Sequence, residues 1–276
     1  MAGATLVARA AGRTRHAPIG PHSRPTRTGS DATDKRRNAA QERPGRPPTS
    51  ASGPGNEPQD RLLADTANGG PAFVIATAAA RHRPELAVAN AVGWFARFGL
   101  AIEELPATGR RQANAPGNAE RARSGRFFYL VGGDPGIVPA TLRDTAVWIA
   151  VTEAWRSGAA LAGSSAGAMA LGEWTLTRDR RPGDANRRAT AGLALVPGLA
   201  VIPHFETFGE GWVPSARDAL PVTTLVGLDE RTAAVWTSDG VWRAMGPGGV
   251  TVIRSDGAAR TASGEEIDGL PQPRFA

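Results

Sequence analysis

The sequence predicts an α/β domain over residues 61–276, with a mainly parallel central sheet flanked by helices and a C-terminal β-ribbon. Short apolar runs alternate with amphipathic stretches from about residue 72 onwards, and glycine or polar residues follow the apolar runs. Of the 276 residues, 41% are apolar, which is enough to bury a sizeable core. These observations favour one domain in which helices connect parallel strands.

The first half of this domain alternates strand and helix signals. The run FVIAT (73–77) predicts a buried strand, and a helix is expected to begin near Pro84 and to end near Gly99. The run LAIEEL (100–105) predicts a strand whose amphipathic pattern suits a sheet edge. The next expected elements are a weak helix near Ala119–Arg123, a strand at Phe127–Val131 and one long helix that ends near Trp155.

The second half is expected to hold mostly strands. The run Ala159–Gly163 predicts a buried strand that leads directly into a stretch of small residues. We expect the last three of the strands that follow to form the ribbon, because glycine-containing turns separate them. The later strands are expected at Leu199–Ile202, Thr224–Leu228, Ala233–Trp236, Val241–Met245 and Val250–Arg254.

Residues 1–60 differ from the rest in composition. They carry ten basic and five acidic residues, a net charge of +5, which leaves a net charge of +1 for residues 61–276. The segment is rich in proline and arginine and shows no helix or strand period, so we predict a disordered basic tail. Since the domain is nearly neutral, nucleic acid is not an expected partner, and an arginine-rich arm that binds nucleic acid is the least favoured function.

Composition also excludes whole classes of chemistry. The chain has no cysteine, and Lys35 is its only lysine, so thiolate and Schiff-base chemistry have no residues in the domain. The sequence contains neither a long apolar segment nor a recognisable secretory signal. We therefore expect a cytoplasmic protein that has no membrane partner and needs no metal or cofactor.

One motif concentrates the chemistry. The segment GSSAG (163–167) fits the G-x-S-x-G nucleophile elbow, and it lies between an apolar strand and a helix of small residues, as the elbow requires. Ser165 would be the nucleophile, and the amides at the start of the helix, near Ala166, would face an oxyanion. The plainer interpretation is a crossing where small residues let a helix pack closely on a sheet.

A serine nucleophile needs a base, and the domain offers two histidines. His204 follows the predicted strand Leu199–Ile202, and the active sites of open α/β sheets lie at such strand ends. His82 lies between Arg81 and Arg83, whose charges make it a poorer base. We therefore assign His204 as the base and expect His82 in solvent or at the rim of the site.

An acidic residue must orient the histidine, and two candidates follow the strand predicted at 224–228. Either Asp229 or Glu230 would lie at the sheet edge that carries Ser165 and His204, and the residues alone do not choose between them. Glu206, two residues after the histidine, is expected to contact substrate or to anchor a loop.

A second glycine-containing turn follows the strand predicted at 127–131. Its paired glycines, Gly132 and Gly133, would let backbone N–H groups approach a reacting carbonyl, with Asp134 as a candidate substrate contact. Taken alone, this segment is better explained as an ordinary strand-to-helix turn.

Four segments follow one another along the domain: YLVGGDP (129–135), AGSSAGAM (162–169), GLALVPGLAVIPHF (192–205) and VGLDERTAAVW (226–236). In this order and spacing they resemble the serine peptidase family of dipeptidase E (aspartyl dipeptidase) and cyanophycinase, whose fold is related to class I glutamine amidotransferases. The resemblance implies a Ser-His-Glu triad, which falls on Ser165, His204 and Glu230, and it thereby prefers Glu230 to Asp229. It also implies an oxyanion hole made by the amides of Gly133 and Ala166.

The chain departs from that family in two places. Family members begin with a strand that ends in a Gly-Gly-Gly run, whereas RLLADTANGGPA (61–72) shows no such strand. We therefore expect either an incomplete central sheet or a chain whose true N-terminus differs from residue 1. Cyanophycinases follow the histidine with a run similar to Asp-Gln-Arg, whereas this chain has FETFG (205–209). Cyanophycin is therefore not the preferred substrate.

The sequence thus predicts a serine peptidase that cleaves a peptide or isopeptide-like amide through an acyl-enzyme. Its expected partners are a peptide or small amide substrate and, as a further possibility, a second copy of the chain in a homodimer. The alternative from another class is a catalytically inactive module that binds a peptide or small molecule on the same fold, and it would apply if the missing strand left the site malformed.

Overall fold

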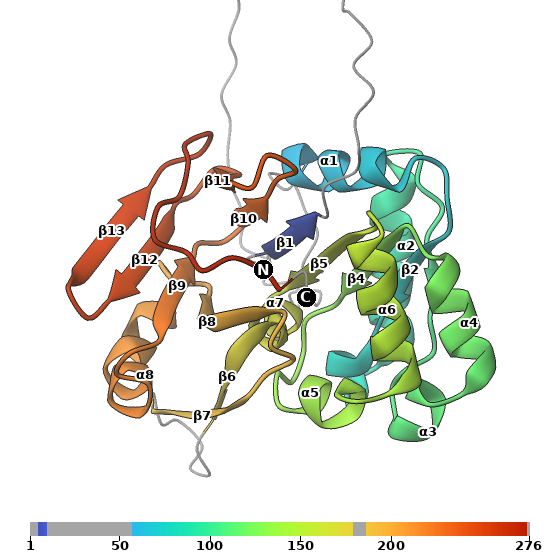
Figure 1. Ribbon diagram of the computed structural model, residues 1–276, viewed down its shortest axis with the longest axis horizontal. Helices are drawn as coiled ribbons and strands as arrows, with labels where there is room; N and C mark the ends of the chain where they lie inside the picture. Colours follow the sequence, from blue (N-terminus) through green and yellow to red (C-terminus); the bar gives the residue numbers. More distant parts are fainter. Residues whose placement is uncertain (1–4, 10–56, 179–185, 275–276) are drawn as a thin grey trace, which may run out of the picture. The chain divides into compact units, whose positions relative to one another are not determined.

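The computed structural model of the protein describes residues 5–9, 57–178 and 186–274. All of them belong to one compact unit, in which helices pack on two β-sheets (Figure 1). The predicted α/β class is confirmed. Among these residues, no helix is both long enough and apolar enough to cross a membrane.

Sheet A contains seven strands in the order β11-β10-β1-β5-β4-β2-β3. Strands β5, β4, β2 and β3 run parallel to one another, which confirms the predicted, mainly parallel sheet. The short strand β3 lies at the edge, as its amphipathic pattern predicts. The bounds are β1 Thr5–Arg9, β2 Ala72–Ile75, β3 Glu103–Glu104, β4 Phe127–Leu130, β5 Ala160–Ser164, β10 Ala233–Trp236 and β11 Trp242–Met245.

Helices cover both faces of sheet A, and the alternation of side chains along β4 shows how. Phe127 and Tyr129 belong to the apolar cluster that contains residues of α1 and α2, whereas Phe128 and Leu130 belong to the cluster that contains residues of α6. Both faces are buried, so the strand reads as a continuous apolar run. The helices of this half are α1 Glu57–Ala67, α2 Pro84–Ala96, α3 Arg110–Ala113, α4 Pro116–Ser124, α5 Ile137–Leu142 and α6 Ala146–Arg156, with the 3₁₀ helix η1 at Thr77–Ala79.

The single long helix expected to end near Trp155 is two helices, so that prediction is wrong. Helix α5 ends at Leu142, Asp144 has a φ of 58°, and Thr145 caps α6 by accepting a hydrogen bond from the N–H of Trp148. A left-handed residue followed by an N-cap ends one helix and starts another. The apolar period alone could not locate this break.

Sheet B contains six strands in the order β13-β12-β9-β8-β6-β7, with β6, β8 and β9 parallel. Its presence corrects the expectation of one central sheet with a three-strand ribbon. The hairpin β10–β11 extends sheet A, and only β12 and β13 form an antiparallel C-terminal ribbon, on sheet B. The bounds are β6 Gly172–Arg178, β7 Arg187–Ala191, β8 Val196–Pro203, β9 Thr224–Leu228, β12 Val250–Arg254 and β13 Gly257–Thr261, with α7 Ala166–Leu171, η2 Gly209–Trp212 and α8 Val213–Ala219 between them.

The N-terminal segment supplies the strand that the sequence analysis found missing. Strand β1 lies between β10 and β5, pairing parallel with the first and antiparallel with the second. The disordered tail predicted for residues 1–60 is therefore corrected at residues 5–9, and α1 crosses the predicted boundary at residue 60. The apolar run TLVA (5–8) is the one sequence feature that indicates a strand here. No local pattern predicts that this strand pairs with strands more than 150 residues away. Residues 10–56 lie outside the described residues.

Because β1 is an interior strand, a proline in it should disrupt sheet A. Val7 is aligned with Val235 of β10 on one side and with Ala162 of β5 on the other. Val7→Pro removes a backbone donor from this ladder and should lower the melting temperature by several degrees or prevent folding. Val7→Ala keeps the N–H and serves as the control in the same thermal scan. Equal melting temperatures for the two variants would contradict the placement of β1.

A buried carboxyl group couples the stability of this half of the fold to pH. Asp60 of α1 is 2% exposed, and its Oδ2 accepts a hydrogen bond of 2.8 Å from Trp94 Nε1 of α2. The pKa of Asp60 is raised from 3.8 to about 7, mainly by burial. The hydrogen bond from Trp94 opposes this rise, and the charge of Glu57 adds to it. A raised acid pKa means that the folded chain holds this proton more tightly than the unfolded chain.

We therefore expect the free energy of unfolding to fall as the pH rises from 3.8 to about 7. The fall should be about 1.4 kcal/mol for each unit of the shift. Asp60→Asn keeps an oxygen acceptor for Trp94 but cannot ionise, so it should remove this part of the pH dependence. Asp65→Asn, on the exposed side of the same helix, should leave it in place. Urea unfolding at a series of pH values measures the difference, and parallel curves for wild type and Asp60→Asn would contradict it.

Candidate active site

The predicted site residues come from two sheets rather than from one sheet edge. Ser165 follows β5 of sheet A, while His204 and Glu230 follow the neighbouring strands β8 and β9 of sheet B. Helix α7 carries the chain from β5 into β6 and packs against β5, β6 and β8. The expectation of a single shared edge is therefore wrong, although each residue does lie at the end of its strand.

Ser165 sits in a strained turn between β5 and α7. Its φ of 48° and ψ of −113° are unusual for a residue with a side chain, which is the conformation that an elbow imposes. A Cβ at Gly163 would lie 2.5 Å from the backbone of Gly167, and a Cβ at Gly167 would lie 2.3 Å from the carbonyl oxygen of Leu130. The small residues thus permit both the close helix crossing and the sharp turn.

The structure brings Ser165, His204 and Glu230 into one hydrogen-bonded chain. Ser165 Oγ lies 2.9 Å from His204 Nε2, and His204 Nδ1 lies 2.7 Å from Glu230 Oε1. His204 is 8% exposed, and the ring of Phe208 stacks on its imidazole with centroids 5.1 Å apart. A carboxylate beside Nδ1 favours the tautomer with the proton on Nδ1, in which Nε2 can accept a proton from the serine hydroxyl.

The two acidic candidates after β9 have different partners. Asp229 is 2% exposed, and its Oδ2 accepts a hydrogen bond of 2.8 Å from the N–H of Gly249 and pairs with Arg260 Nη2. Glu230 is the residue that reaches the imidazole. The geometry therefore agrees with the choice implied by the family resemblance, which the strand pattern could not make.

Glu206 anchors a loop. Both of its carboxylate oxygens accept the N–H of Glu230, at 2.9 and 3.0 Å, and it does not line the cavity described below. The pKa of Glu206 is raised above its usual value, mainly by partial burial. The nearby Asp229 adds to the rise, and the hydrogen bond from the N–H of Glu230 opposes it. Of the two roles expected for Glu206, the structure favours the loop anchor over the substrate contact.

A cavity of about 970 Å³ opens at Ser165, and both predicted oxyanion donors line it, as do Asp134 and His82. Ala166 is the first residue of α7, so its N–H has no acceptor within the helix. Gly133 has a φ of 149°, and a Cβ there would lie 2.2 Å from the carbonyl oxygen of Ala78. Only glycine fits at this turn. His82 thus lies at the rim, as expected.

The lining of the cavity includes arginines that the sequence did not single out. Arginines 143, 178, 187 and 188 line it, and Asp134 is the only acidic residue among the described residues that do so. Arg187 stacks on the ring of Trp212 at 3.9 Å, and Arg143 donates to the carbonyl groups of Ala191 and Gly192. Their sequence signal was weak, because arginine is frequent throughout the chain. Within the described ranges, no group of three acidic or histidine side chains could hold a metal ion.

Comparisons with known proteins agree with this arrangement. The model of peptidase family S51 matches residues 50–243. Cyanophycinase from Trichormus variabilis is 28% identical over 208 residues, which cover 73% of this chain and 69% of that protein. Cyanophycinase from Synechococcus elongatus is 32% identical over 131 residues, which cover 46% and 41%. The crystal structure of a peptidase from an acI-B1 Actinobacterium superposes with a TM-score of 0.66 at 29% identity, covering 78% of this chain and 93% of that one.

These similarities show that the protein is a serine-type peptidase, and therefore a hydrolase. The family model matches well over half of the chain. The chain accordingly belongs to peptidase family S51, and the resemblance read from its four sequence segments is confirmed.

The close approach at Gly133 yields a test of the site. Gly133→Ala would force the turn away from Ala78, because a Cβ has no room there and the φ is unfavourable. We expect peptidase activity to fall on the order of a hundredfold, as small displacements at a reacting centre do. Gly117→Ala, at an open position of α4, is the control and should keep full activity. Full activity in Gly133→Ala, measured by initial rates, would remove this turn from the site.

Proposed function

We propose that the protein cleaves a peptide or isopeptide-like amide through a Ser-His-Glu triad of Ser165, His204 and Glu230, with an acyl-enzyme intermediate. The observation that carries this proposal is the hydrogen-bonded chain from Ser165 Oγ through the His204 imidazole to Glu230 Oε1 beside the cavity. The strained backbone of Ser165 supports it as well, since such strain persists where the surrounding structure holds a functional group in place.

In the proposed reaction, Ser165 Oγ attacks the substrate carbonyl carbon while its proton passes to His204 Nε2. The carbonyl oxygen becomes an oxyanion, which the N–H groups of Gly133 and Ala166 would stabilise. Glu230 holds the Nδ1–H and stabilises the imidazolium. The proton on Nε2 then passes to the leaving amine as the C–N bond breaks. A water molecule, deprotonated by His204, releases the acyl group as a carboxylic acid.

The charge of the cavity favours a class of substrate. Its wall carries four arginines against the carboxylate of Asp134, so a peptide with a carboxylate group would be attracted and a cationic peptide repelled. The chain is similar to relatives named cyanophycinases, but its run Phe205–Gly209 departs from the Asp-Gln-Arg-like run that the family resemblance implies for cyanophycinases. We therefore assign a carboxylate-bearing amide rather than cyanophycin. A cytoplasmic location, a homodimer and a basic tail in residues 10–56 stay predictions.

A fluorophosphonate probe tests the proposed triad against the alternative of an inactive binding module. An activated serine should be labelled at one site, and mapping of the labelled peptide should identify Ser165. Labelling should decrease in acid, because protonation of His204 removes the base. No labelling at Ser165 in the folded protein would favour the binding module.

Ser164 provides the matched control. It is the adjacent residue of β5 and is fully buried, and none of the described groups forms a hydrogen bond with its Oγ. Ser165→Ala should abolish labelling, whereas Ser164→Ala should reduce it only modestly. Labelling that survives Ser165→Ala would place the nucleophile elsewhere.

A further inference from the structure

Glu230 is held mainly through its backbone. Its Oε1 binds His204, while its Oε2 is buried and has no hydrogen-bond partner among the described groups. The side chain is 16% exposed. Because one hydrogen bond cannot fix both the position and the direction of a carboxylate, the placement of the Glu230 backbone decides whether Oε1 meets the imidazole.

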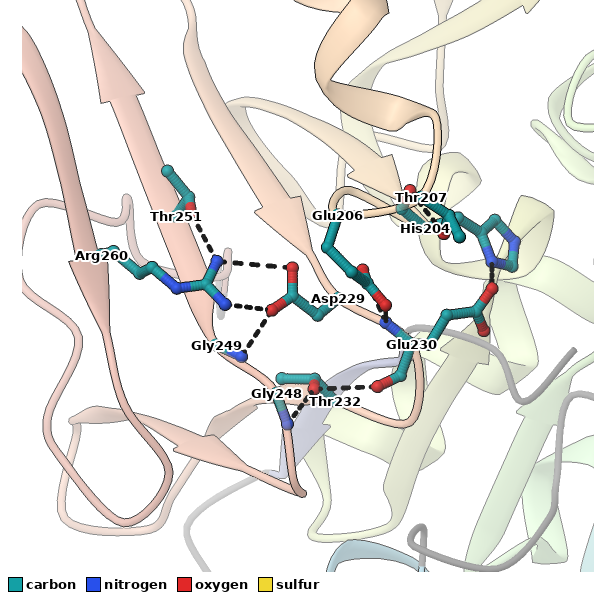
Figure 2. A network of polar contacts seen from close by, with 10 residues as sticks. All are labelled: His204, Glu206, Thr207, Asp229, Glu230, Thr232, Gly248, Gly249, Thr251 and Arg260. Atoms are coloured by element: carbon teal, nitrogen blue, oxygen red, sulfur yellow. Dashed lines mark hydrogen bonds and ion pairs between the residues drawn. The ribbon is translucent and has the colours of Figure 1, made fainter.

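Glu206 makes a return contact to that backbone (Figure 2). It lies two residues after His204, and its carboxylate receives the N–H of Glu230 on both oxygens, at 2.9 and 3.0 Å. Two contacts therefore connect the loop after β8 with the loop after β9, and each loop supplies the side chain of one of them. Glu230 reaches His204 with its side chain, and Glu206 reaches Glu230 with its own.

A second anchor holds the residue before Glu230. The buried Asp229 carboxylate pairs with the guanidinium of Arg260 on β13, and Arg260 Nη1 also lies 3.3 Å from Thr251 Oγ1 on β12 (Figure 2). The N–H of Gly249 donates to Asp229 Oδ2 at 2.8 Å. The ribbon of β12 and β13 thus fixes the start of the loop that carries Glu230.

A third contact closes the same loop on its other side. Thr232 Oγ1 donates to the carbonyl oxygen of Glu230 at 3.2 Å and accepts the N–H of Gly248 at 3.0 Å. A Cβ at Gly248 would lie 2.5 Å from Thr232 Oγ1, so only glycine allows this approach. Glu230 is therefore flanked by anchored residues on both sides.

We propose, on the basis of the function proposed above, that Glu206 and Arg260 are positioning residues that set Glu230 against His204. Glu206 acts on the N–H of Glu230 directly, and Arg260 acts through Asp229. Through Arg260, the C-terminal ribbon thus contributes to the active site. Arg260 lies on β13, beyond residues 50–243, which the family model matches.

Charge balance gives Arg260 a second effect on the loop. Three carboxyl groups, those of Glu206, Asp229 and Glu230, lie within this network, and the guanidinium of Arg260 pairs with that of Asp229. Asp229 raises the pKa of Arg260, and Glu206 adds to that effect. Without the guanidinium, the buried charge of Asp229 would be uncompensated and would push the loop toward solvent.

A double-mutant cycle tests the proposal in the full-length protein. We expect Glu206→Ala and Arg260→Ala each to slow fluorophosphonate labelling of Ser165 roughly tenfold, as loss of a charge-assisted hydrogen bond would. In a Glu230→Gln background neither should slow it further, since both act through Glu230. Losses that simply add to that of Glu230→Gln would overturn the proposal.

Matched and conservative variants separate positioning from general damage. Glu210→Ala and Arg254→Ala change an exposed residue of the same type in the same region and should stay within twofold of wild type. Glu206→Gln keeps one acceptor oxygen for the N–H of Glu230, so its labelling rate should lie between those of wild type and Glu206→Ala. A rate for Glu206→Gln below that of Glu206→Ala would contradict the assigned contact.

A measurement on the resting protein keeps this proposal distinct from the proposed function. The His204 Nδ1–H bound to Glu230 should give a low-field proton resonance, which Glu206→Ala and Arg260→Ala should shift or broaden while circular dichroism stays native. If wild type is not labelled but this resonance moves in the variants, the proposed function fails and the positioning roles stand. If the resonance and the labelling rate are both unchanged in the variants, the positioning roles fail.

Discussion

The close packing of α7 on sheet A is the constraint on which the rest of the site depends. Gly163 and Gly167 bring helix and strand so near that any side chain would collide with backbone. This contact forces the sharp turn at Ser165, and the six residues of α7, all buried, then deliver the chain into sheet B. One local approach therefore creates both the strained serine and the junction between the sheets.

The junction explains why the site needs so many supporting contacts. Ser165 follows a strand of one sheet, and His204 and Glu230 follow strands of the other, so no single strand ladder aligns all three. Alignment instead comes from the paired loops after β8 and β9, which Glu206 ties together, and from the ribbon that holds Asp229. Elements far from the serine thus contribute to the geometry at its hydroxyl group.

Sheet A depends in the same way on distant segments. Its interior strand β1 comes from the extreme N-terminal part of the chain, whereas its neighbour β10 comes from residues 233–236. Helix α1 covers the same half of the fold, and its buried Asp60 makes that packing sensitive to pH. The N-terminal region is therefore part of the peptidase fold at residues 5–9 and from residue 57 onward.

The sequence by itself determined the α/β class, most strand positions, the elbow at Ser165 and the histidine that faces it, because apolar periodicity, glycine spacing and residue inventory are local properties. Tertiary structure alone decided that β1 completes sheet A and that the strands divide between two sheets. It also supplies the contacts that pair Asp229 with Arg260 and Glu230 with His204, a choice that the strand pattern left open and that the family resemblance alone implied. Two adjacent acidic residues after a strand look alike in sequence. Which of them meets the imidazole depends on partners supplied by β12 and β13, and such long-range contacts leave no local pattern.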